Sequence, residues 1–456
     1  MDIARHTRLL SELLRLGVPL LISMSAIVGL GVTDTIMSGL ASTRDLAALA
    51  IGSAILLIPM MLLIGLLSVV APRVSWHLGR NNHNDAAHDC WQAMWLGGVV
   101  GAVCAVVVLL LLPLLALLGL EPEVLVVAED YLRIVVVMLP LFGVSLALRN
   151  TIDGLGFPVL NMWVSIGGLL LNALLDYLFV FGRLGIPQLG AVGCAVATVG
   201  VVTLQLAAPI AQSLIHKKIR AYRVLDRWHL PQWSGCKTLL LLGLPAAFAV
   251  TLEECFFSST SLLVAPMGTN SLAAHQVVLN IAMLALIFPI AMGQAAAILI
   301  GRSLGNETPD QAAHQARFFL WVLFSMMLLC CLLMLSGRGL LMDLFTKDVI
   351  VKSIGAGLLL IVAFQLIVDG LQIGSNIALK GYQDTFVPAV CQMVAYWGVG
   401  FPLAYLLTRT TWAGEGGVER VWYALFAGLS VAAVLGVWRL FTVSDRFVKG
   451  TMQLKH

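Results

Sequence analysis

The sequence predicts an all-α integral membrane protein, with about twelve transmembrane helices in two bundles of six. Of its 456 residues, 60% are hydrophobic and 11% are charged, whereas a soluble domain averages about 25% charged residues. Long apolar runs recur along the whole chain, whose mean hydropathy is +0.95. A sequence repeat divides these runs into two halves. This composition is typical of polytopic membrane proteins.

Each transmembrane helix needs about 20 apolar residues, and charged or Pro/Gly-rich breaks separate the runs. In chain order, the predicted spans are 14–37, 46–70, 92–118, 124–148, 159–181, 189–214, 239–264, 273–300, 318–336, 351–378, 386–407 and 420–440. The first span carries Asp34 and lacks an A-x-A cleavage site. We therefore expect it to remain in the membrane rather than to be removed as a signal peptide.

The basic residues lie mainly on one side of this arrangement. With the N-terminus inside, nineteen of the 27 Lys and Arg residues fall in inner segments and seven fall in outer ones. Cytoplasmic loops carry such an excess of positive charge. We therefore expect both termini in the cytoplasm.

The two halves of the chain repeat at a constant offset of 226 residues. The matching pairs include Leu16 with Leu242, Gly17 with Gly243, Pro19 with Pro245, and Gly79 with Gly305. Six spans are an even number, so both copies insert in the same direction, and an axis along the membrane normal should relate them. We predict an N-terminal lobe at 1–215, a basic cytoplasmic linker at 216–237 and a C-terminal lobe at 238–456.

Four polar residues of the first half are candidates for one site inside the membrane. Asp34 lies in the first span, Asn172 and Asp176 share one face of the fifth, and Thr198 lies in the sixth. A charged group in hydrocarbon is costly and is kept mainly for function. Hard cations such as Na⁺ prefer oxygen ligands, and two carboxylates can also share a proton. We predict a coupling-cation site here; the simpler alternative is that Asn172 and Asp176 only bridge helices.

The second half carries its own acidic residues in the seventh and tenth spans. Glu253 and Asp369 are predicted to bind the coupling cation or the substrate, because intramembrane carboxylates are costly. Glu254 lies about 100° away from Glu253 around the helix, so both cannot face one cavity. Its role is left open.

The eighth span contributes weaker candidates. Gln276 and Asn280 lie on roughly one side of the helix and are predicted to line a substrate cavity. His275 is expected to be structural, although the ordinary pKa of histidine would permit a proton-carrying role.

The sequence argues against several other classes of protein. It contains no P-loop and no H-E-x-x-H, so neither an ATP-driven pump nor that type of metalloprotease is indicated. Its eight cysteines form no C-x-x-C pair, so we expect them to be packing residues and expect no cofactor. Short basic loops are topology signals, so no nucleic-acid partner is expected. A membrane enzyme would cluster its catalytic groups near one interface, whereas these carboxylates occur in both halves.

Five long motifs occur in order along the chain. They are GVTDTIMSG around Asp34, LLLNALLDYLFVFGRLGIPQLGAVGCAVAT from Leu169, GLPAAFAVTLEECFF around Glu253, LVAPMGTNSLAAHQVVLN through Asn280, and ALKGYQDT after the tenth span. With them, the chain resembles the multidrug and toxic compound extrusion (MATE) family, and within it the NorM branch, from about Pro19 to Phe441. The resemblance implies a MATE-type fold and a protein that acts as a monomer in the lipid bilayer.

The resemblance also implies cation antiport, in which inward Na⁺ or H⁺ drives the export of cationic, amphipathic drugs such as fluoroquinolones and dyes. It implies that Asp34, Glu253 and Asp369 bind coupling and substrate cations. Position 176 departs from the NorM pattern, which commonly has Asn there, whereas the DinF-like branch has Asp within a Na⁺ site. Asp176 therefore leaves both Na⁺ and H⁺ open.

The nearest alternative function is a flippase or exporter of lipid-linked or other amphipathic substrates on the same architecture. Such a protein should line its cavity with several basic residues to hold pyrophosphate. The polar groups inside these spans are mainly acidic, with Arg133 as a basic exception. This pattern favours the drug exporter.

Overall fold

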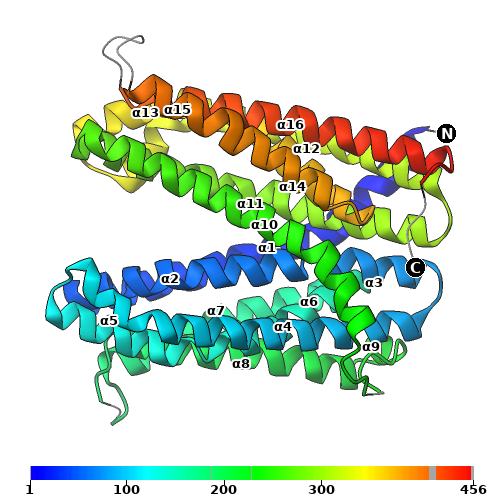
Figure 1. Cartoon of the computed structure of the whole chain (residues 1–456), viewed down its shortest axis with the longest axis horizontal. Helices are drawn as coiled ribbons and strands as arrows, with labels where there is room; N and C mark the ends of the chain where they lie inside the picture. The colour runs from blue at the N-terminus through cyan, green and yellow to red at the C-terminus, as the bar shows by residue number, and fades with distance from the viewer. Residues whose placement is uncertain (1, 186, 227, 410–416, 453–456) are drawn as a thin grey trace. The chain divides into compact units, whose positions relative to one another are not determined.

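The computed structural model describes residues 2–185, 187–226, 228–409 and 417–452, and every regular element in these ranges is helical (Figure 1). The α-helices are α1 Asp2–Ala41, α2 Thr43–Leu67, α3 Val70–Gly79, α4 His83–Leu111, α5 Pro122–Val135, α6 Met138–Gly154, α7 Pro158–Phe181, α8 Ala191–Ile215, α9 Lys217–Arg220, α10 Trp233–Val264, α11 Thr269–Gly305, α12 Pro309–Phe345, α13 Val349–Gly381, α14 Phe386–Met393, α15 Phe401–Arg409 and α16 Glu419–Val448. Short 3₁₀ or π segments, η1 Leu112–Leu118, η2 Ala265–Met267 and η3 Val394–Gly400, follow α4, α10 and α14.

The membrane-spanning helices match the predicted number. Within the described residues, eleven helices or unbroken helical runs are long and apolar enough to cross a membrane, and the pair α5–α6 makes a twelfth if it counts as one span. The predicted all-α membrane fold is therefore confirmed.

The fourth predicted span, 124–148, is not a single straight helix. It is broken between α5 and α6, whose axes differ by 42°. Pro140 supplies the reason, because proline has no N–H with which to bond the carbonyl four residues earlier. That carbonyl, of Val136, instead accepts a hydrogen bond from the Leu139 amide at 3.0 Å.

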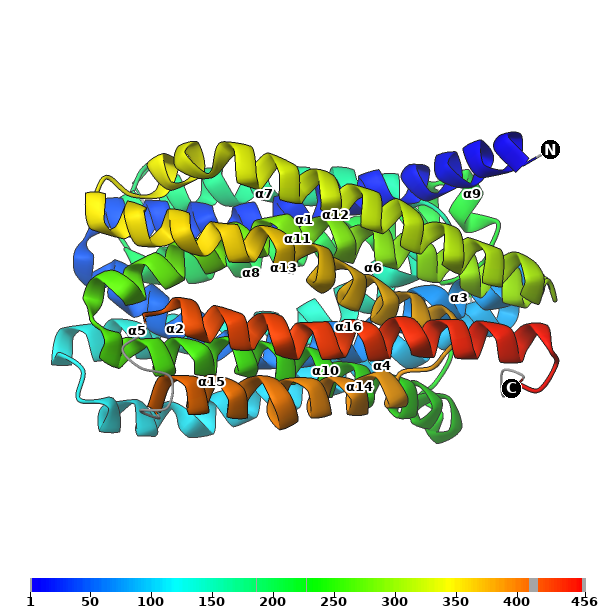
Figure 2. The same cartoon turned by 90° about the horizontal axis from the view of Figure 1, so that it is seen from above.

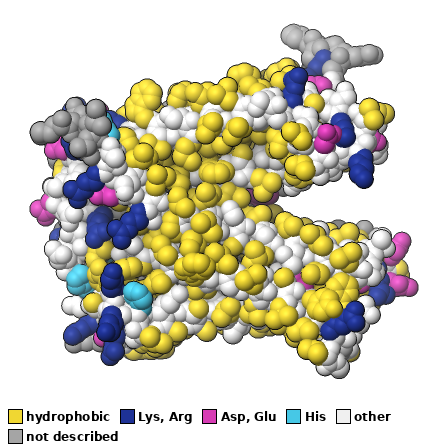
Figure 3. Space-filling model, turned by 180° about the vertical axis from the view of Figure 1, so that it is seen from behind, with side chains coloured by type: hydrophobic (Ala, Val, Ile, Leu, Met, Phe, Trp, Pro, Cys, Tyr) yellow, Lys and Arg dark blue, Asp and Glu magenta, His cyan; other side chains and the backbone are white. Residues whose placement is uncertain are grey.

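Apolar side chains cover much of the lateral surface of the helices, while charged side chains gather toward the helix ends (Figure 3). Leu110, Leu262 and Trp321 are each more than 70% exposed. A water-soluble protein rarely exposes such continuous apolar surface. The protein is therefore a multi-pass membrane protein.

The described chain forms two compact units. We call residues 18–247 the N-terminal unit, and residues 1–17 together with 248–456 the C-terminal unit. These boundaries fall inside α1 and α10, so they differ from the predicted lobe boundaries at 215 and 238. Apolar packing explains the start of α1, because Leu9 and Leu13 line one small pocket with Leu299 and Phe319 of the C-terminal unit.

In the N-terminal unit, glycines allow α4 and α6 to pack closely. A Cβ atom added at Gly97 would lie 2.5 Å from the carbonyl oxygen of Gly143, and one added at Gly101 would clash with Leu139. Gly97 and Gly101 form a G-x-x-x-G pair, the spacing that lets helix backbones approach in membranes. Gly193 of α8 similarly lies against the backbone of Phe179 in α7.

In the C-terminal unit, α13 packs against α11, α12 and α16 (Figure 2). Gly370 and Gly374 of α13 face Met327 and Leu323 of α12, where a larger residue would clash. The first half of α13 contributes buried apolar residues such as Leu358 to the core of this unit. These contacts fix the rotation of α13 about its axis.

Candidate functional site

Three helices of the N-terminal unit bring the predicted polar residues together. Asp34 comes from α1, Asn172 and Asp176 come from successive turns of α7, and Thr198 comes from α8. Asn172 donates a hydrogen bond to Asp34 Oδ1 at 2.9 Å, and Thr198 donates a longer one to Asp34 Oδ2 at 3.4 Å. All four predicted residues thus lie at one place. Their role in coupling stays a prediction.

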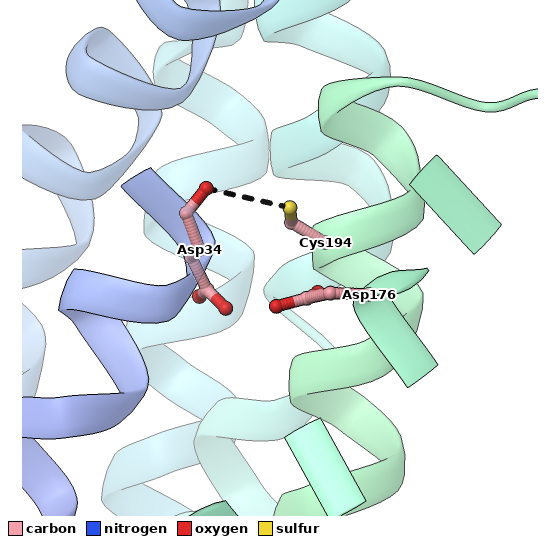
Figure 4. A group of neighbouring side chains, drawn as sticks. All are labelled: Asp34, Asp176 and Cys194. Atoms are coloured by element: carbon pink, nitrogen blue, oxygen red, sulfur yellow. Dashed lines mark hydrogen bonds between the residues drawn. The ribbon is translucent and has the colours of Figure 1, made fainter. Parts of the chain in front are cut away.

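The two carboxylates of this site face one another (Figure 4). One ligand atom each of Asp34, Asp176 and Cys194 lies within 4.8 Å of the others. Asp176 is fully buried, and neither of its carboxylate oxygens has a hydrogen-bond partner among the described residues. Buried polar atoms normally have hydrogen-bond partners. The unpartnered Asp176 oxygens therefore favour the binding of a proton or a cation between the two carboxylates.

The donor atoms at the site fit a hard cation. Oxygen atoms of Asp34, Asp176 and Thr198 converge there, and Asn172 Oδ1 is buried without a hydrogen-bond partner. Na⁺ prefers such oxygen ligands. Cys194, which donates to the Asp34 backbone carbonyl at 3.8 Å, offers a soft sulfur that does not suit Na⁺. The same oxygens can hold a shared proton.

Cys194 is the neighbour that sequence reasoning missed. Its thiol lies 3.3 Å from Ser38 Oγ, beside the Asp34 carboxylate. Its position four residues before Thr198 on one helix face was a usable signal. We expected the cysteines to be packing residues, and Cys194 in fact packs against the site.

The C-terminal unit holds a second acidic group. Tyr396 of η3 donates a hydrogen bond to Glu253 Oε1 at 3.3 Å, and Trp397 donates to the carbonyl of the preceding Leu252. Asp369 of α13 is 2% exposed, and its Oδ1 has no hydrogen-bond partner among the described residues. The charge of Glu253 acts on both Asp369 and Lys380. These three ionisable groups therefore form one electrostatic cluster.

The other candidates of this unit lie on α11. Gln276 and Asn280 are exposed on α11; Gln276 donates to Ser261 Oγ at 3.0 Å and Asn280 donates to the Gln276 carbonyl. No hydrogen bond among the described residues joins this pair to Glu253 or Asp369, so its place in a cavity wall stays a prediction. His275 is buried edge-on to Trp422, as a packing residue would be.

Two further patterns have structural explanations. Arg133, the basic exception among the spans, lies at an exposed position of α5 and pairs with Glu129 at 3.1 Å.

Residues 301–305 match G-x-S-x-G, the signature of a hydrolase nucleophile on a strand-to-helix turn. Here Ser303 lies within α11 and donates to Gln315, so this match is not such a turn.

The fold and these groups define a class: a polytopic membrane protein of two halves, each with acidic residues inside its helices. A family model described as MatE matches residues 19–178 and again 245–406. The two matches begin 226 residues apart, the offset of the predicted repeat. The chain belongs to the MatE family, and within it to the NorM branch.

Several known proteins are similar to the chain. It is 32% identical to the probable multidrug resistance protein NorM of Mannheimia succiniciproducens, covering 95% of this chain and 94% of that protein. It is 31% identical to the multidrug resistance protein PmpM of Pseudomonas aeruginosa, over 96% and 93% of the two chains. The crystal structure of the eukaryotic MATE transporter AtDTX14 shares the fold, with a TM-score of 0.87, 17% identity, and coverage of 98% and 100%.

Proposed function

We propose that the protein exports cationic, amphipathic drugs in exchange for Na⁺ or H⁺. Its membership of the MatE family and the names of its NorM and PmpM relatives support drug export. The observation that carries the coupling is the pairing of the half-buried Asp34 with the fully buried Asp176. This is the activity of a secondary transporter, not of an enzyme, and it requires no cofactor beyond the coupling ion.

The electrostatics of the pair explain why it takes up a cation. Ligand atoms of Asp34 and Asp176 lie within 4.8 Å of each other. At an effective dielectric constant of about 20, two full charges at that distance repel by about 3 kcal/mol. A proton or Na⁺ removes this repulsion. Asn172 and Thr198 orient Asp34 through their hydrogen bonds and add oxygen ligands.

Coupling requires each ligand to bind the two states of the transporter unequally. Cation binding to the carboxylates neutralises them and favours the state that releases drug outside. Drug binding from the cytoplasm favours the state that releases the cation inside. Glu253 and Asp369 of the C-terminal unit supply a second negative centre for a cationic substrate or ion. Alternating access then exchanges one positive ligand for another.

The setting of this activity is a bacterial inner membrane, with both termini cytoplasmic, as the distribution of basic residues favours. The substrates are lipophilic cations such as dyes and fluoroquinolones. The functional form is a monomer with no nucleic-acid partner.

Reconstituted liposomes test the proposal. A fluorescent cationic dye is followed under a Na⁺ gradient at fixed pH, and then under a pH gradient without Na⁺, for the wild type and Asp176→Asn. Export driven by Na⁺ and lost in the variant would identify a sodium site. Export driven only by the pH gradient would identify a proton pair. If neither gradient moves the dye, drug antiport is refuted, and the flippase becomes the better explanation.

A further inference from the structure

One face of α13 carries a continuous row of polar residues. Gln365, Asp369, Gln372, Asn376 and Lys380 are spaced by four, three, four and four residues. At 100° per residue they fall within an arc of about 80°. Side chains at this spacing stand one above another along the helix. The row therefore runs from the middle of α13 to its last turn.

The first three members of this row are deeply buried, Asn376 and Lys380 are half-buried, and several polar atoms of the row have no partner. Gln365, Asp369 and Gln372 are 3%, 2% and 0% exposed. Within the described residues, Gln365 Oε1, Asp369 Oδ1, both amide atoms of Gln372 and Asn376 Nδ2 lack hydrogen bonds. Burying such atoms unpaired is costly, and ordered water is their usual partner in polar interiors.

The first half of α13 is apolar along this same face. Val351, Leu358 and Val362 continue the row toward the start of α13, and all three are buried in the apolar core of the C-terminal unit. The change from apolar to polar falls between Val362 and Gln365. Water is therefore favoured on only one side of this boundary, the side that leads to the end of α13.

The row also points into the unit rather than toward α12. Gly370 and Gly374, on the other side of the helix, pack against α12. Asn376 lies against α16 at Gly436, where a Cβ atom would approach Asn376 Oδ1 to 3.1 Å. The charge of Lys380, at the end of the row, acts on Glu253.

We propose that Gln372, Asn376 and Lys380 line a hydrated path that carries the coupling cation between the inner end of α13 and the Glu253–Asp369 pair. The inference rests on the proposed antiport and on a cytoplasmic end for α13. The path from Asp369 to Lys380 spans about 17 Å along the helix.

Two substitutions at Gln372 separate conduction from packing. Gln372→Leu keeps the size of the side chain and removes its polar atoms, whereas Gln372→Ser leaves room for water. We expect dye export by the Leu variant to fall about tenfold or more, and export by the Ser variant to stay within about threefold of the wild type. The thermal midpoint in detergent should be lower for the Ser variant than for the Leu variant, because the Ser variant leaves a gap in the core.

Gln365→Leu is the matched control, because Gln365 has the same residue type, face and burial but lies beyond Asp369 from the inner end. It should export at the wild-type rate. Liposomes are run under a Na⁺ gradient and under a pH gradient, and the gradient that Gln372→Leu fails to use identifies the cation.

Equal export by the two Leu variants would overturn the path. So would loss of export in both Gln372 variants together with a lower thermal midpoint, because that result indicates a packing role. Failure of the wild type to export under either gradient would instead overturn the proposed antiport.

Discussion

At the scale of single residues, Asp34 is the group on which the proposed activity depends most. Asn172 and Thr198 both donate hydrogen bonds to its carboxylate, and Asp176 faces it. Asp34→Asn keeps the shape of the side chain and removes its negative charge. We expect dye export to fall to the level of protein-free liposomes while the protein still inserts and folds.

Thr35→Val is the control for that variant, because the Thr35 hydroxyl bonds only the Gly31 carbonyl of its own helix among the described contacts. It should export normally. Full export by Asp34→Asn would remove Asp34 from the mechanism.

A second residue-scale prediction concerns a buried ion pair in the N-terminal unit. Asp89 lies 2.5 Å from Arg73 Nε and 2.9 Å from His77 Nε2. Removing one partner of a buried pair typically costs about 3–5 kcal/mol, because the other charge is left uncompensated. Asp89→Ala should therefore lower the thermal midpoint in detergent by many degrees. Asp85→Ala, at an exposed position of the same helix, should change it little; an equal effect of both variants would contradict this account.

At the scale of elements, the packing of α4 on α6 depends on glycine. A methyl group at Gly143 would meet the Gly97 carbonyl, whereas one at Gly167 of α7 has nothing within 4 Å. Gly143→Ala should lower the thermal midpoint, and Gly167→Ala should leave it unchanged or raise it, since alanine favours helix by roughly 1 kcal/mol. If Gly143→Ala were as stable as Gly167→Ala, close α4–α6 contact would be excluded.

The linker that precedes α10 is held on α4 by Gln92. Gln92 donates to the Leu230 carbonyl at 3.0 Å, and its Oε1 accepts from the Gln232 amide at 2.7 Å. The Gln92 side chain is buried, and losing these two bonds costs about 1–3 kcal/mol. Gln92→Ala should therefore speed tryptic cleavage after Lys217 and Lys218 about tenfold or more under native conditions. Thr238→Val, which removes only a bond within α10, should not; equal rates would refute this anchoring role.

The presence of the membrane-spanning helices was predictable from the sequence, because the length of an apolar run and the spacing of its polar residues are local properties. The spans, and the shared face of Asn172 and Asp176, follow from them. The break before Pro140 depends on a single proline within an apolar run, which reads as continuous. The place of Cys194 beside Asp34, and the inward orientation of Gln372, depend on how helices pack. Helix packing depends on contacts between distant segments, so no single segment predicts it.

At the scale of the whole molecule, the 226-residue repeat predicted two related halves, and the MatE family matches begin at that same offset. The ends of the compact units were not predictable from the repeat, because α1 and α10 each continue from one unit into the other. Helix ends follow contacts rather than sequence symmetry. The acidic residues inside the helices do not recur at the 226-residue offset, so each half has acidic residues at different positions.

The central claim is that drug and coupling cation exclude one another through linked binding. Reciprocal linkage means that the cation must weaken drug affinity by the same factor as drug weakens cation affinity. The most direct measurement is the Kd of tetraphenylphosphonium, a lipophilic cation, for the detergent-solubilised protein by calorimetry, over a range of Na⁺ concentration and pH. We expect the wild-type Kd to rise by roughly 5–150-fold with one of the two cations, and that dependence to vanish in Asp34→Asn. A wild-type Kd that is independent of both Na⁺ and pH would contradict the account.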